Sequence, residues 1–361
     1  MRFALSEDQA ALRDAARELL VRECPPAVVR AGWPGGEADP ARVLGVWAKL
    51  AEMGVLGAAV PEEAGGLGLG ACDVVPLLEE AGRVALPLPL AETAFVAAPA
   101  LAQAAEAGNA EAGELLERMI AGEAIVAAGL DGSGLVPFAG VAEALLVGDG
   151  PGGEIWLVAA EEAEAVQSID GARALGRVRL GSAGGAADEG GGAAPSDGRR
   201  LDLTAAQRAA AWDRGALGAA AQLLGLSRTL LALSTEYVKE RRQFGVPIGT
   251  FQAVKHHLAN ALLALEFAAP AALRAAWSLD HGAATASRDV AMAKALASDA
   301  AERVAGVSLQ VHGAIAYTTE YDLHLFAKRV WAGARAWGDA EWQRARVGAA
   351  LGLETPGPAV P

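Results

Sequence analysis

The chain has 361 residues, of which 53% are hydrophobic, so it is long enough to bury more than one core. Its formal net charge is -14 at pH 7, and no long run of Lys or Arg provides a footprint for phosphate backbones, which argues against a nucleic-acid partner. The two cysteines, Cys24 and Cys72, are far apart, which predicts a reducing compartment and no disulfide framework.

The N-terminal segment and the hydropathy pattern predict a cytoplasmic protein with no membrane partner. The opening stretch, MRFALSEDQAALRDAA, becomes charged within a few positions and does not resemble a secretory signal. No charge-free apolar run approaches the ~20 residues that a bilayer span requires.

Helical spacing dominates residues 1–122, which we expect to form an N-terminal α-helical domain. Ser6 is a predicted N-cap, and large apolar residues follow it at helical spacing. The predicted helices cover 6–23, 40–53, 73–84 and two runs between 87 and 122.

A glycine-rich segment, GGLGLGA at 65–71, contains a G-x-G-x-x-A match to the dinucleotide-binding fingerprint. That motif requires a preceding buried strand and a βαβ unit. Here AAVPEEA, with a proline and two carboxylates, precedes it in a helical context. We therefore predict a loop at this position and no dinucleotide-binding fold.

Residues 123–203 change to short β-compatible runs, which predict a reduced β domain. AIVAAGL, EALLVGD, EIWLVAA and ALGRVRL are bounded by Gly, Asp and Ser clusters, the pattern of a small sheet. The region ends in GSAGGAADEGGGAAPSDGRR, whose composition predicts a mobile or loosely ordered stretch.

The last part of the chain, 204–361, predicts a C-terminal four-helix bundle. Four long helical segments are joined by short connections, which favours antiparallel neighbours. The segments run over 206–241, 251–281, 286–312 and 319–350. The predicted fold class is therefore α+β and mainly α, with helices, a small sheet and a helical bundle in that order.

The connection between the first two bundle helices, ERRQFGVPIGTFQ, has an unusual composition. Arg241 and Arg242 lie at a helix C-terminus, where positive charge complements the helix dipole, so a purely structural role for them stays open. It does not explain Phe244 and the Gly/Pro corner that follows. Arginine binds phosphate with a bidentate fork, phenylalanine offers a flat face to an aromatic ring, and Gln252 adds an amide. These groups suit a dinucleotide such as FAD.

No metal site is predicted. His256 and His257 are adjacent on a predicted helix and therefore point roughly 100° apart, so they cannot chelate one ion together. No cluster of Cys, His and Asp has the spacing of metal ligands.

Five segments resemble the acyl-CoA dehydrogenase family. ERRQFGVPIGTFQAVKHHLAN (240–260) is similar to the family's connection between its first two C-terminal helices. LQVHGAIAYTTEYDLHLFAKR (309–329) is similar to its Q-x-x-G-G-x-G-Y-x-x-E-Y segment. VPEEAGGLGLG (60–70) with EEAGR (79–83) resembles its N-terminal helical domain, and SIDGARAL (168–175) its D-x-T-R turn. These segments span nearly the whole chain in the family's order.

This resemblance implies the family's fold and its reaction, the α,β-dehydrogenation of an acyl-CoA thioester. In that reaction a glutamate removes the α-proton and the β-hydride passes to FAD. Each flavin in the family is bound by two subunits. The elements that the neighbouring subunit contributes match five residues here, which are the expected cofactor-binding residues: Arg241, Phe244, Gln252, Gln310 and Gly313.

The same resemblance implies that the catalytic base is missing. Counting from Gln310 without gaps places the family's glutamate at Trp337, which cannot accept a proton. The alternative family position, early in the helix that ends at Arg241, falls on Gly215. The strand region is also shorter than the family's. No catalytic residue is therefore expected in this chain.

Because these losses all affect the half of the site that a subunit contributes to itself, the chain resembles the base-lacking subunit of heteromeric steroid-degrading acyl-CoA dehydrogenases. The expectation is an α2β2 heterotetramer in which it completes the FAD site of a homologous partner. An acyl-CoA, including a bulky steroid-derived one, is the implied substrate class. Two alternatives stay open. One is a self-sufficient homotetramer whose base has moved to Asp213 or to Glu341, one helical turn beyond Trp337. The other is a flavin-free assembly scaffold.

Overall fold

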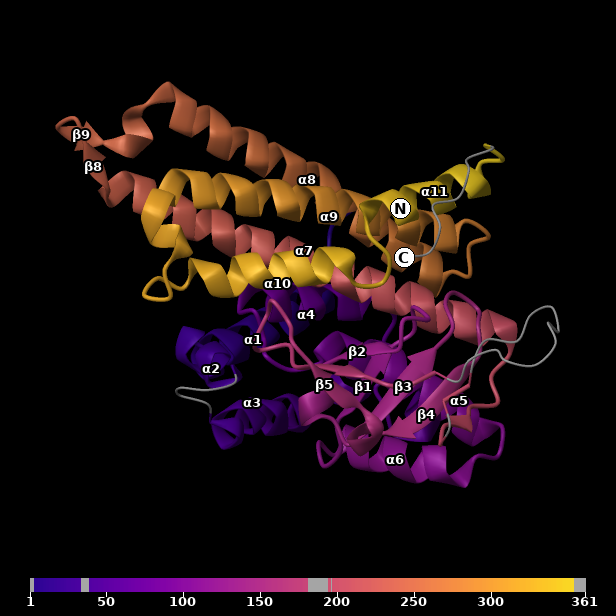
Figure 1. The fold of residues 1–361 in the computed structure, drawn as a ribbon. Helices are drawn as coiled ribbons and strands as arrows, with labels where there is room; N and C mark the ends of the chain where they lie inside the picture. Colours follow the sequence, from indigo (N-terminus) through magenta and orange to yellow (C-terminus); the bar gives the residue numbers. More distant parts are fainter. Residues whose placement is uncertain (1–2, 34–38, 181–193, 196, 354–361) are drawn as a thin grey trace. The chain divides into compact units, whose positions relative to one another are not determined.

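The computed structural model describes residues 3–33, 39–180, 194–195 and 197–353 (Figure 1). Most of the Gly/Ala/Ser-rich stretch that was predicted to be mobile therefore lies outside the described residues. Helices, then strands, then helices follow one another along the chain, so the predicted mainly helical architecture is confirmed.

The elements divide into three groups along the chain. The first helices are α1 (Glu7–Glu23), α2 (Pro26–Ala31), α3 (Pro40–Glu52), α4 (Ala71–Arg83), α5 (Ala98–Glu106) and α6 (Ala110–Ile120). The strands that follow are β1 (Val126–Gly129), β2 (Leu135–Pro137), β3 (Ala144–Gly148), β4 (Ile155–Ala159), β5 (Glu164–Val166), β6 (Leu175–Arg177) and β7 (Arg199–Arg200). The last helices are α7 (Ala205–Glu240), α8 (Gln252–Asp280), α9 (Ala286–His312), α10 (Leu323–Arg335) and α11 (Ala340–Ala350), with the hairpin strands β8 (Arg242–Gln243) and β9 (Val246–Pro247) between α7 and α8.

Most predicted helix boundaries agree with the structure, and one prediction is wrong. The segment 319–350 is not a single helix, because the chain breaks between α10 and α11. Helix α2 and the short strands β2, β5 and β7 were not predicted. The glycine-rich segment 65–70 is a loop with no strand before it, as predicted, and α4 begins directly after it.

The chain forms two compact units, each assembled from separate segments. One unit comprises 1–26, 75–86 and 219–361, and the other comprises 27–74 and 87–218. The second unit contains the sheets, in the strand orders β1-β3-β4-β7 and β2-β6-β5, with β1 and β3 parallel.

Strands β1 and β3 are buried along their whole length, which explains their continuous apolar sequences. Their side chains form a core with Val136, Phe138, Trp156 and Val178. A π-helical segment, Ala91–Ala97, is tied to β1 because the Thr93 hydroxyl donates to the Val126 carbonyl over 2.7 Å.

The first unit is a set of long helices that lie side by side in Figure 1, with α9 packed against α8, α10 and α11. Ion pairs fasten α1 and α7 to α4: Arg17 binds Glu80 in a bidentate pair at 2.9 and 2.7 Å, and Arg228 binds Glu79 at 2.6 Å. Glu80 is almost fully buried, and Arg17 and Arg83 pair with its carboxylate.

Helices α4 and α7 cross at two glycines. A Cβ atom at Gly225 would lie 1.9 Å from the Glu79 carbonyl oxygen, and one at Gly82 would lie 2.2 Å from the Gln222 carbonyl oxygen. Only glycine permits this backbone approach, since both obstacles are main-chain atoms that cannot rotate away.

Among the described residues, helices α7 and α8 are long and apolar enough to cross a membrane by length and composition alone. Of the most apolar 18-residue stretch in each helix, 72% is buried in α7 but only 28% is buried in α8. Burial in the core accounts for the composition of α7. It does not account for that of α8.

We predict that Gly225→Ala lowers the free energy of unfolding by about 3 kcal/mol, because the added methyl group forces α4 and α7 apart. Gly306→Ala in α9 is the matched control, since nothing lies within 4 Å of a Cβ placed there. That control should stabilise the chain by about 0.5–1 kcal/mol. Urea unfolding of both variants measures the difference, and equal effects would contradict the close crossing.

Candidate functional site

The connection between α7 and α8 is a short β-hairpin at one end of the helical unit (Figure 1). Its base is closed by a hydrogen bond of 2.8 Å from the Ile248 amide to the Arg241 carbonyl. The side chain of Arg241 is left exposed. The hairpin thus projects a guanidinium group from the end of a rigid helix.

The tip of the hairpin holds an aromatic ring out in solvent. Phe244 and Gly245 have φ angles of 52° and 81°, the left-handed pair that a two-residue hairpin turn requires. Such a turn normally uses Asn-Gly, so phenylalanine is held here in an unfavourable conformation. Phe244 is 93% exposed, and its ring lies in an edge arrangement with that of Phe251, at 6.2 Å between ring centroids. Backbone strain and an exposed ring together indicate a binding role.

Aromatic contacts bring the end of α9 to the end of α7. The rings of Tyr237 and His312 stack with centroids 4.2 Å apart, and the Tyr237 hydroxyl donates to the His312 carbonyl over 3.3 Å. Gln310 and Gly313 flank His312 and are exposed. Gly313 has φ 64° and ψ -141°, a conformation that essentially only glycine adopts. The structure therefore gathers the predicted cofactor residues of α7, α8 and α9 at the same end.

The hairpin at this end of the unit carries positive charge. Arg241 and Arg242 lie in the hairpin, and Gln252 is the first residue of α8, whose N-terminus has no side-chain cap and no acidic residue in its first turn. An uncapped N-terminus of a long helix attracts anions through its amide groups and its dipole. The combination fits a diphosphate attached to an aromatic base.

Sequence reasoning missed the cluster that supports this end, Tyr237, His312 and Tyr321. The His312 Nδ1 atom lies 2.7 Å from the Ser308 carbonyl, so Nδ1 donates, and Nε2 can accept from the Tyr321 hydroxyl at 3.3 Å. Burial lowers the pKa of His312 below its usual value, although the bond to the Ser308 carbonyl opposes this. The imidazole therefore remains neutral where an exposed histidine would take up a proton.

The position of the expected catalytic glutamate lies at the break between α10 and α11. Trp337 has a φ of 59° and is 5% exposed, and Gly338 follows with a φ of 78°. Asp339 then caps α11 by accepting a hydrogen bond of 2.9 Å from the Trp342 amide. The corner therefore buries an indole, and Trp337 has no group that accepts a proton from carbon.

Two buried polar side chains hold this corner. The Lys294 ammonium group of α9 donates to the Ser298 hydroxyl at 2.9 Å and to the carbonyls of Ala334 at 3.0 Å and Gly338 at 3.1 Å. The Gln343 amide of α11 donates to the Trp337 carbonyl over 2.6 Å. Both donors are fully buried, so the main chain on either side of Trp337 is fixed.

The two candidates for a displaced base occupy different environments. Glu341 is exposed in the first turn of α11, and the prediction that it lies one helical turn beyond Trp337 is wrong, because Trp337 belongs to no helix. Asp213 is buried on α7. Its role as a base stays a prediction, as does the absence of a base at Gly215.

Comparison with known proteins places this geometry in a family. Residues 6–123 match the acyl-CoA dehydrogenase N-terminal domain and residues 203–352 match the C-terminal domain. Over 324 residues the chain is 30% identical to acyl-CoA dehydrogenase IpdE2 of Mycobacterium tuberculosis. This match covers 90% of this chain and 91% of that protein. The chain belongs to the acyl-CoA dehydrogenase family.

Other relatives extend this comparison. Acyl-CoA dehydrogenase FadE34 of Mycobacterium tuberculosis is 33% identical over 87% of this chain, although the match spans only 43% of that longer protein. Among solved structures, a variant of the Tcur3481-Tcur3483 steroid ACAD superposes with a TM-score of 0.80 at 27% identity, covering 96% of this chain and 98% of that one. The ChsE4-ChsE5 complex from Mycobacterium tuberculosis superposes with a TM-score of 0.80 at 26% identity, and the match covers 99% of this chain and 100% of that one.

Acyl-CoA dehydrogenases are typically FAD-dependent oxidoreductases, and part of this chain fits that cofactor. The exposed Phe244 ring, the Arg241 guanidinium and the uncapped start of α8 together suit the dinucleotide portion of FAD. At position 337, where a glutamate was expected from the family pattern, the side chain is a buried indole and not a carboxylate.

Substitutions at Trp337 test the corner. We predict that Trp337→Ala lowers the free energy of unfolding by about 3–5 kcal/mol, because it empties a buried aromatic site. Trp337→Gly should cost roughly 1 kcal/mol less than alanine, since glycine relieves the left-handed backbone. Thermal unfolding compares the two, and a less stable glycine variant would contradict the observed backbone conformation.

The lowered pKa of His312 predicts acid sensitivity. As pH falls below about 6.5, the unfolded chain gains a proton on this histidine that the folded chain does not take up, so stability falls with pH. His312→Asn should therefore flatten the dependence of the unfolding midpoint on pH between 7.5 and 5.5. His256→Asn, at an exposed position of α8, is the matched control, and an equal effect of the two substitutions on the slope would contradict the prediction.

Proposed function

We propose that this chain is the base-lacking subunit of a heteromeric, FAD-dependent acyl-CoA dehydrogenase, and that its hairpin completes a flavin site in a homologous partner. The observation that carries the proposal is the contrast within one helical unit. Groups suited to a dinucleotide are exposed around Phe244, whereas a buried Trp337 stands at the position expected for the base.

Each exposed residue has a role that follows from its chemistry. The Arg241 guanidinium pairs with a pyrophosphate, and the N-terminus of α8 adds amide dipoles beside Gln252. Phe244 packs its ring against an aromatic base. Gln310 provides an amide, and Gly313 lets the backbone approach closely. FAD, when bound, supplies the hydride acceptor of the reaction.

The corner at Trp337 makes the chain dependent on a second subunit for proton removal. The indole cannot act as a base, and Lys294 and Gln343 fix the main chain on both sides of it. A carboxylate able to take the α-proton of an acyl-CoA would come from the partner.

Comparison with known structures supports a two-chain assembly and a substrate class. Two solved structures that cover nearly all of this chain are named for pairs of proteins, Tcur3481-Tcur3483 and ChsE4-ChsE5, and the first is described as a steroid ACAD. We therefore propose an α2β2 heterotetramer in the cytoplasm and a bulky, steroid-derived acyl-CoA as its substrate.

One observation favours a second candidate function, a self-sufficient homotetramer. Asp213 is a buried carboxylate on α7, and burial suits a base that takes a proton from carbon. In that case the chain alone would carry both flavin and activity.

The deciding experiment compares the chain purified alone with the chain co-expressed with a homologue that has glutamate at the base position. We expect a colourless protein alone and a yellow α2β2 complex with one flavin for each pair of chains, measured by visible absorption and native mass. A yellow homotetramer with one flavin per chain, bleached by an acyl-CoA, would contradict the proposal and favour Asp213.

The hairpin is tested in the same complex. We predict that Arg241→Ala weakens FAD binding about 10- to 100-fold, as expected for loss of a charged hydrogen bond. Arg242→Ala is the matched control, because it removes the same charge from the hairpin. In the parent chain the Arg242 guanidinium donates to the Gly245 carbonyl within the hairpin at 3.4 Å, so it is not expected to bind the cofactor. Equal losses of flavin in the two variants would indicate a general charge effect and no specific role for Arg241.

A further inference from the structure

A cavity of about 260 Å³ lies where α1, α4, α7 and α8 meet, and its lining residues all belong to one compact unit. Part of the lining is apolar and includes Leu5, Leu224 and Leu273. The charged part of the lining consists of arginines and glutamates. These residues are Arg13, Arg17, Arg83, Arg228, Glu79 and Glu80.

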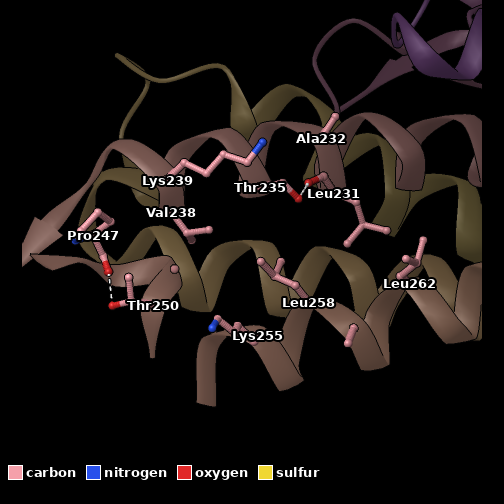
Figure 2. Close-up of a pocket in the computed structure, with 12 residues that line it drawn as sticks. Leu231, Ala232, Thr235, Val238, Lys239, Pro247, Thr250, Lys255, Leu258 and Leu262 are labelled. Carbon is pink, nitrogen blue, oxygen red and sulfur yellow. Dashed lines mark hydrogen bonds between the residues drawn. The ribbon is translucent and has the colours of Figure 1, made fainter. Parts of the chain in front are cut away.

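This cavity is separate from the hairpin and from the larger groove between α7 and α8. Arg228 lies on α7 about 20 Å from the start of the hairpin, since a helix rises about 1.5 Å per residue. Figure 2 shows the groove, which has a volume of about 610 Å³. Within the described part of the chain, its charged lining residues are Lys239 and Lys255 alone. The groove is therefore lined by no carboxylate, whereas the cavity combines cations with buried anions.

The two glutamates of the cavity are already bound by two of its arginines. Both carboxylate oxygens of Glu80 accept hydrogen bonds from the Arg17 guanidinium, at 2.9 and 2.7 Å. The Glu79 Oε1 atom accepts from the Arg228 Nε atom at 2.6 Å. The guanidinium group of Arg83 must therefore share carboxylates that are already hydrogen-bonded.

Arg83 is left with longer contacts. Its Nε atom lies 3.3 Å from Glu80 Oε1, and its Nη2 atom lies 3.8 Å from Glu79 Oε1. The Nε atom is buried and has no hydrogen-bond partner among the described residues. Burial lowers the pKa of Arg83, and the charges of Arg17 and Arg228 lower it further, against the opposite effect of the two glutamates. A buried, charged donor without an acceptor is costly, so an anion that accepted its hydrogen bond would be held firmly.

The cavity is positive although the chain is acidic. Four arginines and two glutamates line it, which leaves a formal surplus of two positive charges in a chain whose net charge is -14. Two further carboxylates pair with these arginines, Asp14 with Arg13 and Glu266 with Arg228. Their side chains are 55% and 53% exposed, so solvent screens them more than it screens Glu80. The interior of the cavity therefore favours an anion.

The apolar part of the lining selects the kind of anion. A guanidinium group binds carboxylate and phosphate equally well through its fork of donors. Leu5, Leu224 and Leu273 offer nothing to inorganic phosphate, but they would remove an alkyl chain from water. At about 30 Å³ for each non-hydrogen atom, as for a water molecule, the cavity has room for at least about eight such atoms. A short-chain fatty acid such as hexanoate has this size and this chemistry.

We propose that this cavity is a binding site for a short-chain carboxylate, whose head group pairs with Arg83 and whose alkyl chain lies against the leucines. The site goes beyond the proposed function and does not depend on it. Because α1, α4, α7 and α8 all line the cavity, a bound carboxylate stabilises the junction of these four helices.

The test is a titration of the full-length chain with sodium hexanoate, with isothermal calorimetry and the midpoint of thermal unfolding as readouts. Hexanoate should release or absorb heat and raise the midpoint. Affinity should rise about fourfold for each methylene group that is added between acetate and hexanoate, because each is buried against the leucines.

Substitutions locate the head group. Arg83→Gln should weaken hexanoate binding about 10- to 100-fold, as expected for loss of a charged hydrogen bond. Lys255→Gln removes the same charge from the groove and is the matched control, which should bind hexanoate as the parent does. Arg83→Lys keeps the charge but loses the fork, so it should also weaken binding, and it serves as the second variant if Arg83→Gln does not fold.

Three outcomes would overturn this inference. One is the absence of both heat and a shift of the midpoint with hexanoate. Another is equal affinity for acetate, inorganic phosphate and hexanoate, which would show attraction by charge alone. The third is an equal loss in Arg83→Gln and Lys255→Gln, which would exclude a specific role for the cavity. The flavin content of the chain enters none of these readouts, so the inference and the proposed function fail or stand separately.

Discussion

The bundle depends on a buried ammonium group in its central helix. Lys294 of α9 has no exposed surface, and burying its charge is tolerable only because oxygen atoms surround it. Two of those oxygens are main-chain carbonyls, that of Ala334 in the last turn of α10 and that of Gly338 in the break before α11. One side chain therefore joins α9 to α10 and to the corner that contains Trp337.

The two ends of this unit differ in what they leave exposed. At the corner the polar groups of Lys294 and Gln343 turn inward and the indole of Trp337 is buried. At the other end the Phe244 ring and the Arg241 guanidinium project from a strained hairpin, supported by the stacked rings of Tyr237 and His312. This contrast between the two ends is the basis of the proposal that the chain serves the flavin site of a partner.

The long helices were predictable to within about one residue, because their apolar residues repeat over many turns and the connections between them contain Gly and Pro. The break at 336–339 was missed although its signals were present: Gly338 takes a left-handed conformation and Asp339 caps the next helix. The long apolar pattern on both sides outweighed two local residues. Strands β2, β5 and β7 are too short to show any period.

The sequence motifs were sufficient to identify the family and the five residues expected to meet the cofactor, because residue type and spacing carry that information. They could not show that Gln310 and Gly313 lie at the same end as Phe244, since this depends on the antiparallel course of the helices and on the Tyr237–His312 contact. Composition could not separate α7 from α8 either. Both helices are rich in Ala and Leu, but the apolar stretch of α7 is mostly buried and that of α8 is mostly exposed. Burial depends on which segments, distant in the sequence, pack against each helix, and only the tertiary structure decides this.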